Sequence, residues 1–71
     1  MDTPEQQPFG AVLRGYRVAA GFTQEELAAR AQLSRRTISD LERGVTGAPY
    51  RSTVALLADA LGLDAAQRAA L

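Results

Sequence analysis

Two helix-start signals stand close together between residues 23 and 34, and they constrain the fold more than any other feature of the sequence. Thr23 and Glu26 have the spacing of a capping box, in which each side chain accepts a hydrogen bond from the backbone amide of the other residue. Ser34 is a second N-cap. We therefore expect a short helix that begins at Thr23 and ends near Ala31, and another that begins at Ser34 only a few residues later.

Apolar residues recur at helical spacing along the rest of the chain, and glycines mark the expected helix ends. Gly10 and Gly15 should each weaken the first helix by about 1 kcal/mol relative to alanine. Residues 1–7 lack periodicity and are expected to form a disordered tail. The predicted fold class is all-α, a compact five-helix bundle over residues 8–71. Its expected helices cover about residues 8–20, 23–31, 34–43, 52–61 and 64–71.

The composition removes several classes of function. The chain has 71 residues, enough for one small domain, and contains no cysteine and no histidine. We therefore expect no disulfide, no metal and no cofactor, and the remaining polar residues do not suggest an enzyme. No apolar run approaches the roughly 20 residues that span a bilayer, and the N-terminus does not resemble a signal peptide. These features predict a cytoplasmic protein with no membrane partner.

Charge is neutral over the whole chain but uneven along it. The segment from residue 14 to residue 51 is positive, whereas the other acidic residues lie near the two ends. Its basic residues are Arg14, Arg17, Arg30, Arg35, Arg36, Arg43 and Arg51, and its acidic residues are Glu25, Glu26, Asp40 and Glu42. A local excess of arginine is the electrostatic pattern that nucleic-acid binding requires.

The helix expected over residues 34–43 has one apolar and one polar side. At 100° per residue, Ile38, Leu41 and Ser34 fall on one side, whereas the polar residues Arg36, Ser39, Asp40 and Arg43 fall on the other. An outward arginine can grip guanine or a phosphate with two hydrogen bonds. Two short helices with a brief connection and a basic outer side are the layout of a DNA-reading helix-turn-helix.

Three stretches of the chain resemble the phage repressor and Cro family, also called Xre-type regulators, over roughly residues 9–71. They are Leu13-Arg-Gly-Tyr-Arg17, Ala20-Gly-Phe-Thr-Gln-Glu-Glu-Leu-Ala28 and Leu33-Ser-Arg-Arg-Thr-Ile-Ser-Asp-Leu-Glu-Arg-Gly44. The resemblance implies a lambda-repressor-like fold and sequence-specific binding of double-stranded DNA by a transcriptional regulator. It also implies a set of DNA-binding residues: Gln24 for the backbone or a base edge, Arg35, Arg36 and Asp40 for bases, Thr23, Thr37 and Arg43 for phosphates, and Ser34 beside them.

The chain departs from that family at two positions. Gln32 stands where the family commonly has glycine in a left-handed turn, so this residue should carry strain on the order of 1 kcal/mol. Asp40 adds a carboxylate to the base-reading positions. It could accept a hydrogen bond from a cytosine amine, or it could hold Arg36 in an i, i+4 ion pair, and the sequence favours neither role.

A buried ion pair is also expected. Glu42 falls beside Ile38 on the inward side of its helix, where a lone carboxylate would be costly. Arg17 flanks the apolar stripe of the first helix, and its counterpart in the family pairs with the matching glutamate. We therefore predict an internal Arg17–Glu42 ion pair.

The last two helices leave an apolar surface with no internal partner. Leu56 lies beside the inward stripe of the fourth helix, and Leu71 with the nearby alanines could extend the patch. This surface could form a homodimer, which would bind an inverted-repeat operator, or could dock a missing C-terminal domain. The alternative function is a protein–protein interaction module that retains the helix-turn-helix fold, because fold alone does not determine function.

Overall fold

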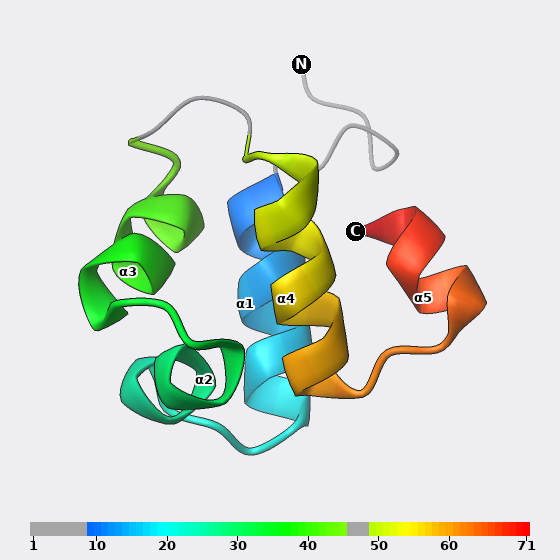
Figure 1. Ribbon diagram of the computed structural model, residues 1–71, viewed down its shortest axis with the longest axis horizontal. Coiled ribbons are helices and arrows are strands. Elements are labelled where there is room, and N and C mark those ends of the chain that lie inside the picture. Colours follow the sequence, from blue (N-terminus) through cyan, green and yellow to red (C-terminus); the bar gives the residue numbers. More distant parts are fainter. Residues whose placement is uncertain (1–8, 46–48) are drawn as a thin grey trace.

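Five helices form the described part of the protein, which in this computed structural model comprises residues 9–45 and 49–71. They are α1 (Phe9–Ala19), α2 (Gln24–Ala31), α3 (Arg35–Arg43), α4 (Arg51–Leu61) and α5 (Ala65–Ala70), and the described residues contain no strand (Figure 1). The predicted all-α fold class is therefore confirmed. The tail predicted over residues 1–7 lies outside the described residues.

The helix ends follow the predicted capping signals. Thr23 caps α2 in a complete capping box with Glu26, and Ser34 caps α3 through the Thr37 amide. Asp64 caps α5 in a second capping box. α4 begins at Arg51, next to the predicted residue 52, and its N-cap residue Tyr50 makes no side-chain capping bond.

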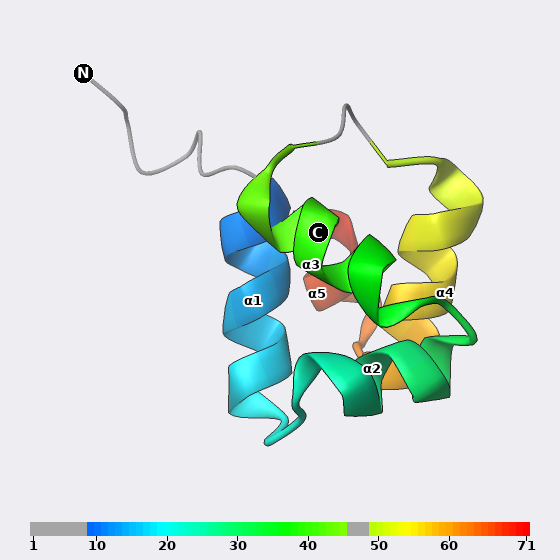
Figure 2. The same cartoon turned by 90° about the vertical axis from the view of Figure 1, so that its left-hand side faces the viewer.

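The two sides of the molecule carry different helices. Figures 1 and 2 agree that α2 and α3 lie on one side of the molecule and α5 on the opposite side, with α1 and α4 on the two flanks between them. The helix-turn-helix therefore occupies a face of its own, away from α5.

None of the helices in the described ranges is long and apolar enough to cross a membrane.

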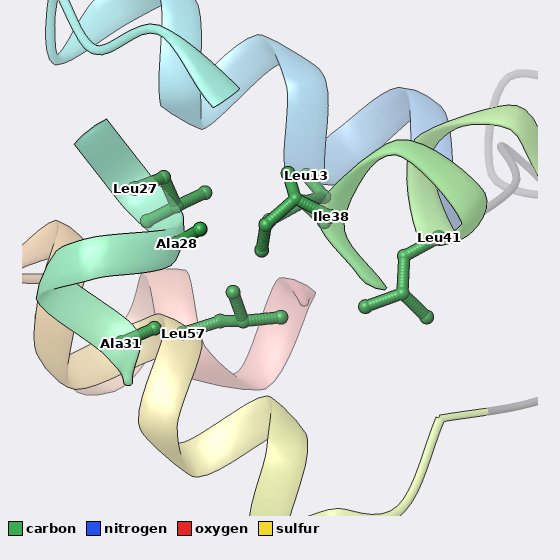
Figure 3. Packing of buried hydrophobic residues seen from close by; sticks show 7 residues of the cluster. All are labelled: Leu13, Leu27, Ala28, Ala31, Ile38, Leu41 and Leu57. Carbon is green, nitrogen blue, oxygen red and sulfur yellow. The ribbon is translucent and has the colours of Figure 1, made fainter. Parts of the chain in front are cut away.

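The hydrophobic core joins the first four helices. Leu13, Leu27, Ile38 and Leu57 contribute one fully buried side chain each from α1, α2, α3 and α4 (Figure 3). Burying one such side chain stabilises the fold by about 1.5–3 kcal/mol, so this small cluster holds the helix-turn-helix against α1 and α4. Tyr16 of α1 is only half-buried.

Leu71 also differs from its prediction. Its side chain is partly buried and packs against the core cluster, so it does not extend an exposed patch. Leu56 is 40% exposed, as expected for a residue beside the inward stripe of α4. The alanines of α5 are exposed as well. The apolar surface of α4 and α5 is therefore smaller than the sequence suggested.

Gly10 has a role that helix propensity does not reveal. It is buried where α1 meets the end of α3, and a Cβ atom there would lie 2.6 Å from the carbonyl oxygen of Glu42 and would also collide with that of Leu41. Real Cβ atoms do not approach backbone oxygens so closely. Glycine therefore costs some helix stability in α1 but allows the two helix backbones to touch. Gly15, by contrast, has open space around it.

Candidate nucleic-acid interface

A tight turn connects α2 to α3. Gln32 ends α2 in the left-handed conformation, with φ 60° and ψ 39°, and is the only non-glycine with positive φ in the part of the chain that the structure describes. The Leu33 amide then donates to the Ala28 carbonyl at 2.9 Å, which satisfies a carbonyl left open by the helix end. The left-handed conformation predicted for Gln32 is thus present, and a Cβ in this region is strained.

The two sides of α3 separate as the helical wheel predicted, with three exceptions. Ile38 and Leu41 are buried, whereas Arg36 and Arg43 are exposed. Ser34 was placed on the inward side, but it is exposed because it caps the helix from outside its first turn. The other two exceptions, Ser39 and Asp40, were placed on the outward side and are partly buried.

The predicted DNA-binding residues share one region around α3 and the start of α2. Of these eight, five are exposed and three are partly buried. The exposed residues are Thr23, Ser34, Arg35, Arg36 and Arg43, and the partly buried ones are Gln24, Thr37 and Asp40. Figure 2 shows the two helices that carry this region in front of the rest of the fold.

Three of the hydroxyl groups already bond to their own helices. The Thr23 hydroxyl accepts from the Glu26 amide at 3.0 Å, and the Glu26 carboxylate accepts from the Thr23 amide at 2.8 Å. Hydrogen bonds from the Thr23 backbone amide and then its hydroxyl lower the pKa of Glu26. The Ser34 hydroxyl accepts from the Thr37 amide at 3.0 Å and bonds the Thr37 hydroxyl at 2.8 Å. These groups fix the starts of α2 and α3.

Asp40 forms the i, i+4 ion pair, which was one of the two roles left open for it. Its Oδ2 lies 3.8 Å from Nε of Arg36. The Arg36 side chain is 91% exposed, whereas that of Asp40 is 26% exposed. At this separation the contact is electrostatic rather than a hydrogen bond. The structure therefore shows the pairing that the sequence left open, and the long arginine side chain stays free to move outward.

The predicted internal ion pair between Arg17 and Glu42 is confirmed. Nε and Nη2 of Arg17 donate to Oε2 and Oε1 of Glu42 at 2.6 and 3.0 Å, and Nη1 donates to the Phe22 carbonyl at 2.8 Å. The two side chains are only 13% and 4% exposed. Burial raises the pKa of Glu42, but the hydrogen bonds from Arg17 and Gln24 outweigh burial and hold it below its ordinary range. Glu42 is therefore a paired, charged carboxylate.

Gln24 makes a contact that the sequence did not predict. Its Nε2 donates to Oε1 of Glu42 at 3.2 Å, so the first residue of α2 is tied to the last turn of α3. Helical spacing relates residues within one helix and gives no information on contacts between two helices. Only the crossing of α2 and α3 brings this amide to the Arg17–Glu42 pair.

Comparison with known proteins identifies the class. The sequence profile of a helix-turn-helix domain family matches residues 8–71. The controller protein C.AhdI of a restriction-modification system from Aeromonas hydrophila is 33% identical and superposes with a TM-score of 0.78, over 86% of this chain and 91% of that one. The clp gene regulator ClgR from C. glutamicum is 31% identical, with a TM-score of 0.78 over 96% and 87% of the two chains.

A third structure is more distant. The restriction-modification controller protein C.Esp1396I is 25% identical and has a TM-score of 0.77 over 94% of this chain and 87% of that one. None of the curated protein sequences matches the chain. Two of the similar structures are thus described as restriction-modification controller proteins and one as a gene regulator.

Fold and site together define a sequence-specific DNA-binding domain of the transcriptional-regulator class. The chain belongs to the helix-turn-helix domain family, as an Xre-type regulator.

Proposed function

We propose that the protein regulates transcription by inserting α3 into the major groove of duplex DNA. The observation that carries this proposal is the division of α3 into a buried apolar side and an exposed side that carries Arg36 and Arg43. Arg35, in the first turn of α3, is exposed as well. A helix that presents several exposed arginines and no exposed large apolar residue suits a groove lined by base edges and phosphates.

The proposed roles follow the position of each residue. Arg35 and Arg36, near the start of α3, would read base edges, as the first residues of recognition helices do. Arg43, at the other end of α3, would contact phosphate, as would Thr23 and Thr37. Ser34 would lie beside these phosphate contacts. Gln24 would reach the backbone or a base edge from the start of α2.

Asp40 would act with Arg36 rather than alone. A free carboxylate close to phosphates is unfavourable, whereas an ion pair next to the groove keeps the charge balanced. On DNA, Arg36 would grip guanine while Asp40 accepts from a neighbouring cytosine amine. Replacing Asp40 with asparagine should then relax the preference at the cytosine more than it lowers overall affinity.

We also propose that the functional unit is a homodimer on an inverted-repeat operator. The support is the exposed Leu56 of α4 together with the exposed alanines of α5, the helix that lies on the side of the molecule away from α3. Two copies that place their α3 helices about 34 Å apart would reach successive major grooves. Sedimentation of the parent and of Leu56→Arg tests the dimer. If the parent is monomeric and the variant binds DNA equally well, the surface is not a dimer interface, and docking of another domain is the remaining role.

A cytoplasmic location stays a prediction.

Salt dependence of DNA binding tests the proposed function. Random duplexes are selected with the protein at low and moderate salt, and the dissociation constant Kd of a selected duplex is measured across salt concentrations. A binder that releases counterions should weaken steeply with salt, with a slope set by its phosphate contacts. Absence of a salt-dependent shift would favour a protein-interaction module.

A further inference from the structure

Glu42 connects three helices at one carboxylate. Its Oε1 accepts from Nη2 of Arg17 on α1 at 3.0 Å and from Nε2 of Gln24 on α2 at 3.2 Å, while Glu42 itself belongs to α3. Within the described residues, all three nitrogens of the Arg17 guanidinium donate to internal acceptors, including the Phe22 carbonyl. Arg17 is therefore fixed in place and acts as a support for the carboxylate.

This arrangement determines which end of the Gln24 amide faces inward. A carboxylate accepts hydrogen bonds and donates none, so the amide nitrogen of Gln24, and not its oxygen, must point at Glu42. One of the two N–H groups on Nε2 is then occupied at 3.2 Å. The second N–H remains available, and Gln24 is partly exposed at the start of α2, where the helix dipole also favours a phosphate.

The charge of Glu42 would oppose DNA if it were alone. A carboxylate close to a phosphate is repelled, and the repulsion grows as water is excluded. Arg17 removes this penalty because its guanidinium forms two hydrogen bonds to the same carboxylate. The pair can thus orient the amide without presenting a net negative charge to the DNA.

We infer that Glu42 is a positioning residue for DNA binding, which holds the Gln24 amide ready to donate its second N–H to the DNA. The inference rests on the proposed function and adds a residue that does not itself touch DNA. A side chain that is ordered before binding loses less rotamer freedom when the complex forms. We expect this ordering to improve Kd by about 2- to 10-fold.

A double-mutant cycle measures the coupling. Kd for one selected duplex is determined at fixed salt for the parent, Glu42→Gln, Gln24→Ala and the double variant. Glu42→Gln removes a negative charge, which strengthens binding to any DNA, but that effect is the same whether residue 24 is glutamine or alanine and cancels in the cycle. Positioning predicts that Glu42→Gln is less favourable by about 2- to 10-fold when Gln24 is present. Equal effects in both backgrounds would overturn the inference.

Thermal unfolding of each variant checks that the fold survives. If Glu42→Gln unfolds, Glu42→Asp takes its place, because it keeps the charge and shortens the reach to Gln24. The parent alone offers a second measurement: the side-chain amide signals of Gln24 in an NMR spectrum should shift as the Glu42 carboxyl titrates, below the ordinary pH range of a glutamate. A Gln24 signal that does not respond to this titration would also refute the inference.

The outcomes separate this inference from the proposed function. A parent that binds no duplex in a salt-dependent manner refutes both. A parent that binds DNA, but shows no coupling between Glu42 and Gln24, refutes only the positioning role. A parent that binds and shows the coupling supports both, since a purely structural role of Glu42 would affect the glutamine and alanine backgrounds at position 24 equally.

Discussion

Two ion pairs of the same chemistry lie in opposite halves of the molecule and differ in their surroundings. Arg17–Glu42, at the junction of α1, α2 and α3, has side chains that are 13% and 4% exposed. Arg68–Asp59, which links α5 to α4, is equally close at 2.5 Å, but its side chains are 42% and 69% exposed. A short distance therefore says little about how much an ion pair stabilises a fold, because solvent screens the second pair and not the first.

The same difference separates α1, α2 and α3, which contain or hold the proposed DNA-binding site, from α4 and α5. The junction of α1 and α3 uses a buried carboxylate and a glycine contact, and the turn between α2 and α3 uses a left-handed residue. Each is costly unless the surrounding structure compensates it. The α4–α5 half is held by apolar packing and an exposed pair. Strict geometry is thus concentrated where the helix-turn-helix must be held in one orientation for DNA.

Loss of the buried pair should have the largest effect on stability. Glu42→Ala leaves Arg17 buried without its partner, so the free energy of unfolding should fall by about 3–5 kcal/mol. Asp59→Ala is the matched control and should cost at most about 1 kcal/mol. Both are measured by denaturant unfolding. The Arg17→Ala/Glu42→Ala double variant should be less destabilised than Glu42→Ala alone, and the reverse order would contradict this account of the junction.

The glycine contact should have the next largest effect. Gly10→Ala forces a Cβ into the carbonyls at the end of α3 and should destabilise the protein by about 1–3 kcal/mol, although alanine is the better helix former. Gly15→Ala in the same helix meets open space and should stabilise it by about 0.5–1 kcal/mol. Thermal unfolding of the two variants gives opposite shifts. A stabilising Gly10→Ala would mean that α1 and α3 do not touch there.

Local signals predicted much of this architecture, because capping and helix-ending residues act within a few positions of the chain. The caps at Thr23 and Ser34 belong to this group, whereas the left-handed Gln32 was expected from the family resemblance. The Arg17–Glu42 pair was also predictable, since an inward carboxylate needs a partner and the family resemblance suggested which one. The site was thus recognisable from the sequence, although which residues touch DNA stays a prediction.

Contacts between helices could not be predicted in the same way. Gly10 was interpreted only through helix propensity, and nothing in the spacing indicated that α3 passes over it. The Gln24–Glu42 hydrogen bond depends on the crossing of α2 and α3. Leu71 packs against the core because of where α5 lies. The pattern of the six residues of α5 does not indicate that position.

The central claim is that α3 reads bases near its start and holds the backbone at its end. The most direct test compares Arg36→Ala with Arg43→Ala on the selected duplex and on duplexes changed at single base pairs, across a range of salt. Arg36→Ala should cost about 1–3 kcal/mol in binding and relax the preference at one base position. Arg43→Ala should weaken all sequences alike and reduce the salt slope by about one. If both variants keep the parent's affinity, sequence preference and salt slope, α3 is not the DNA-reading helix.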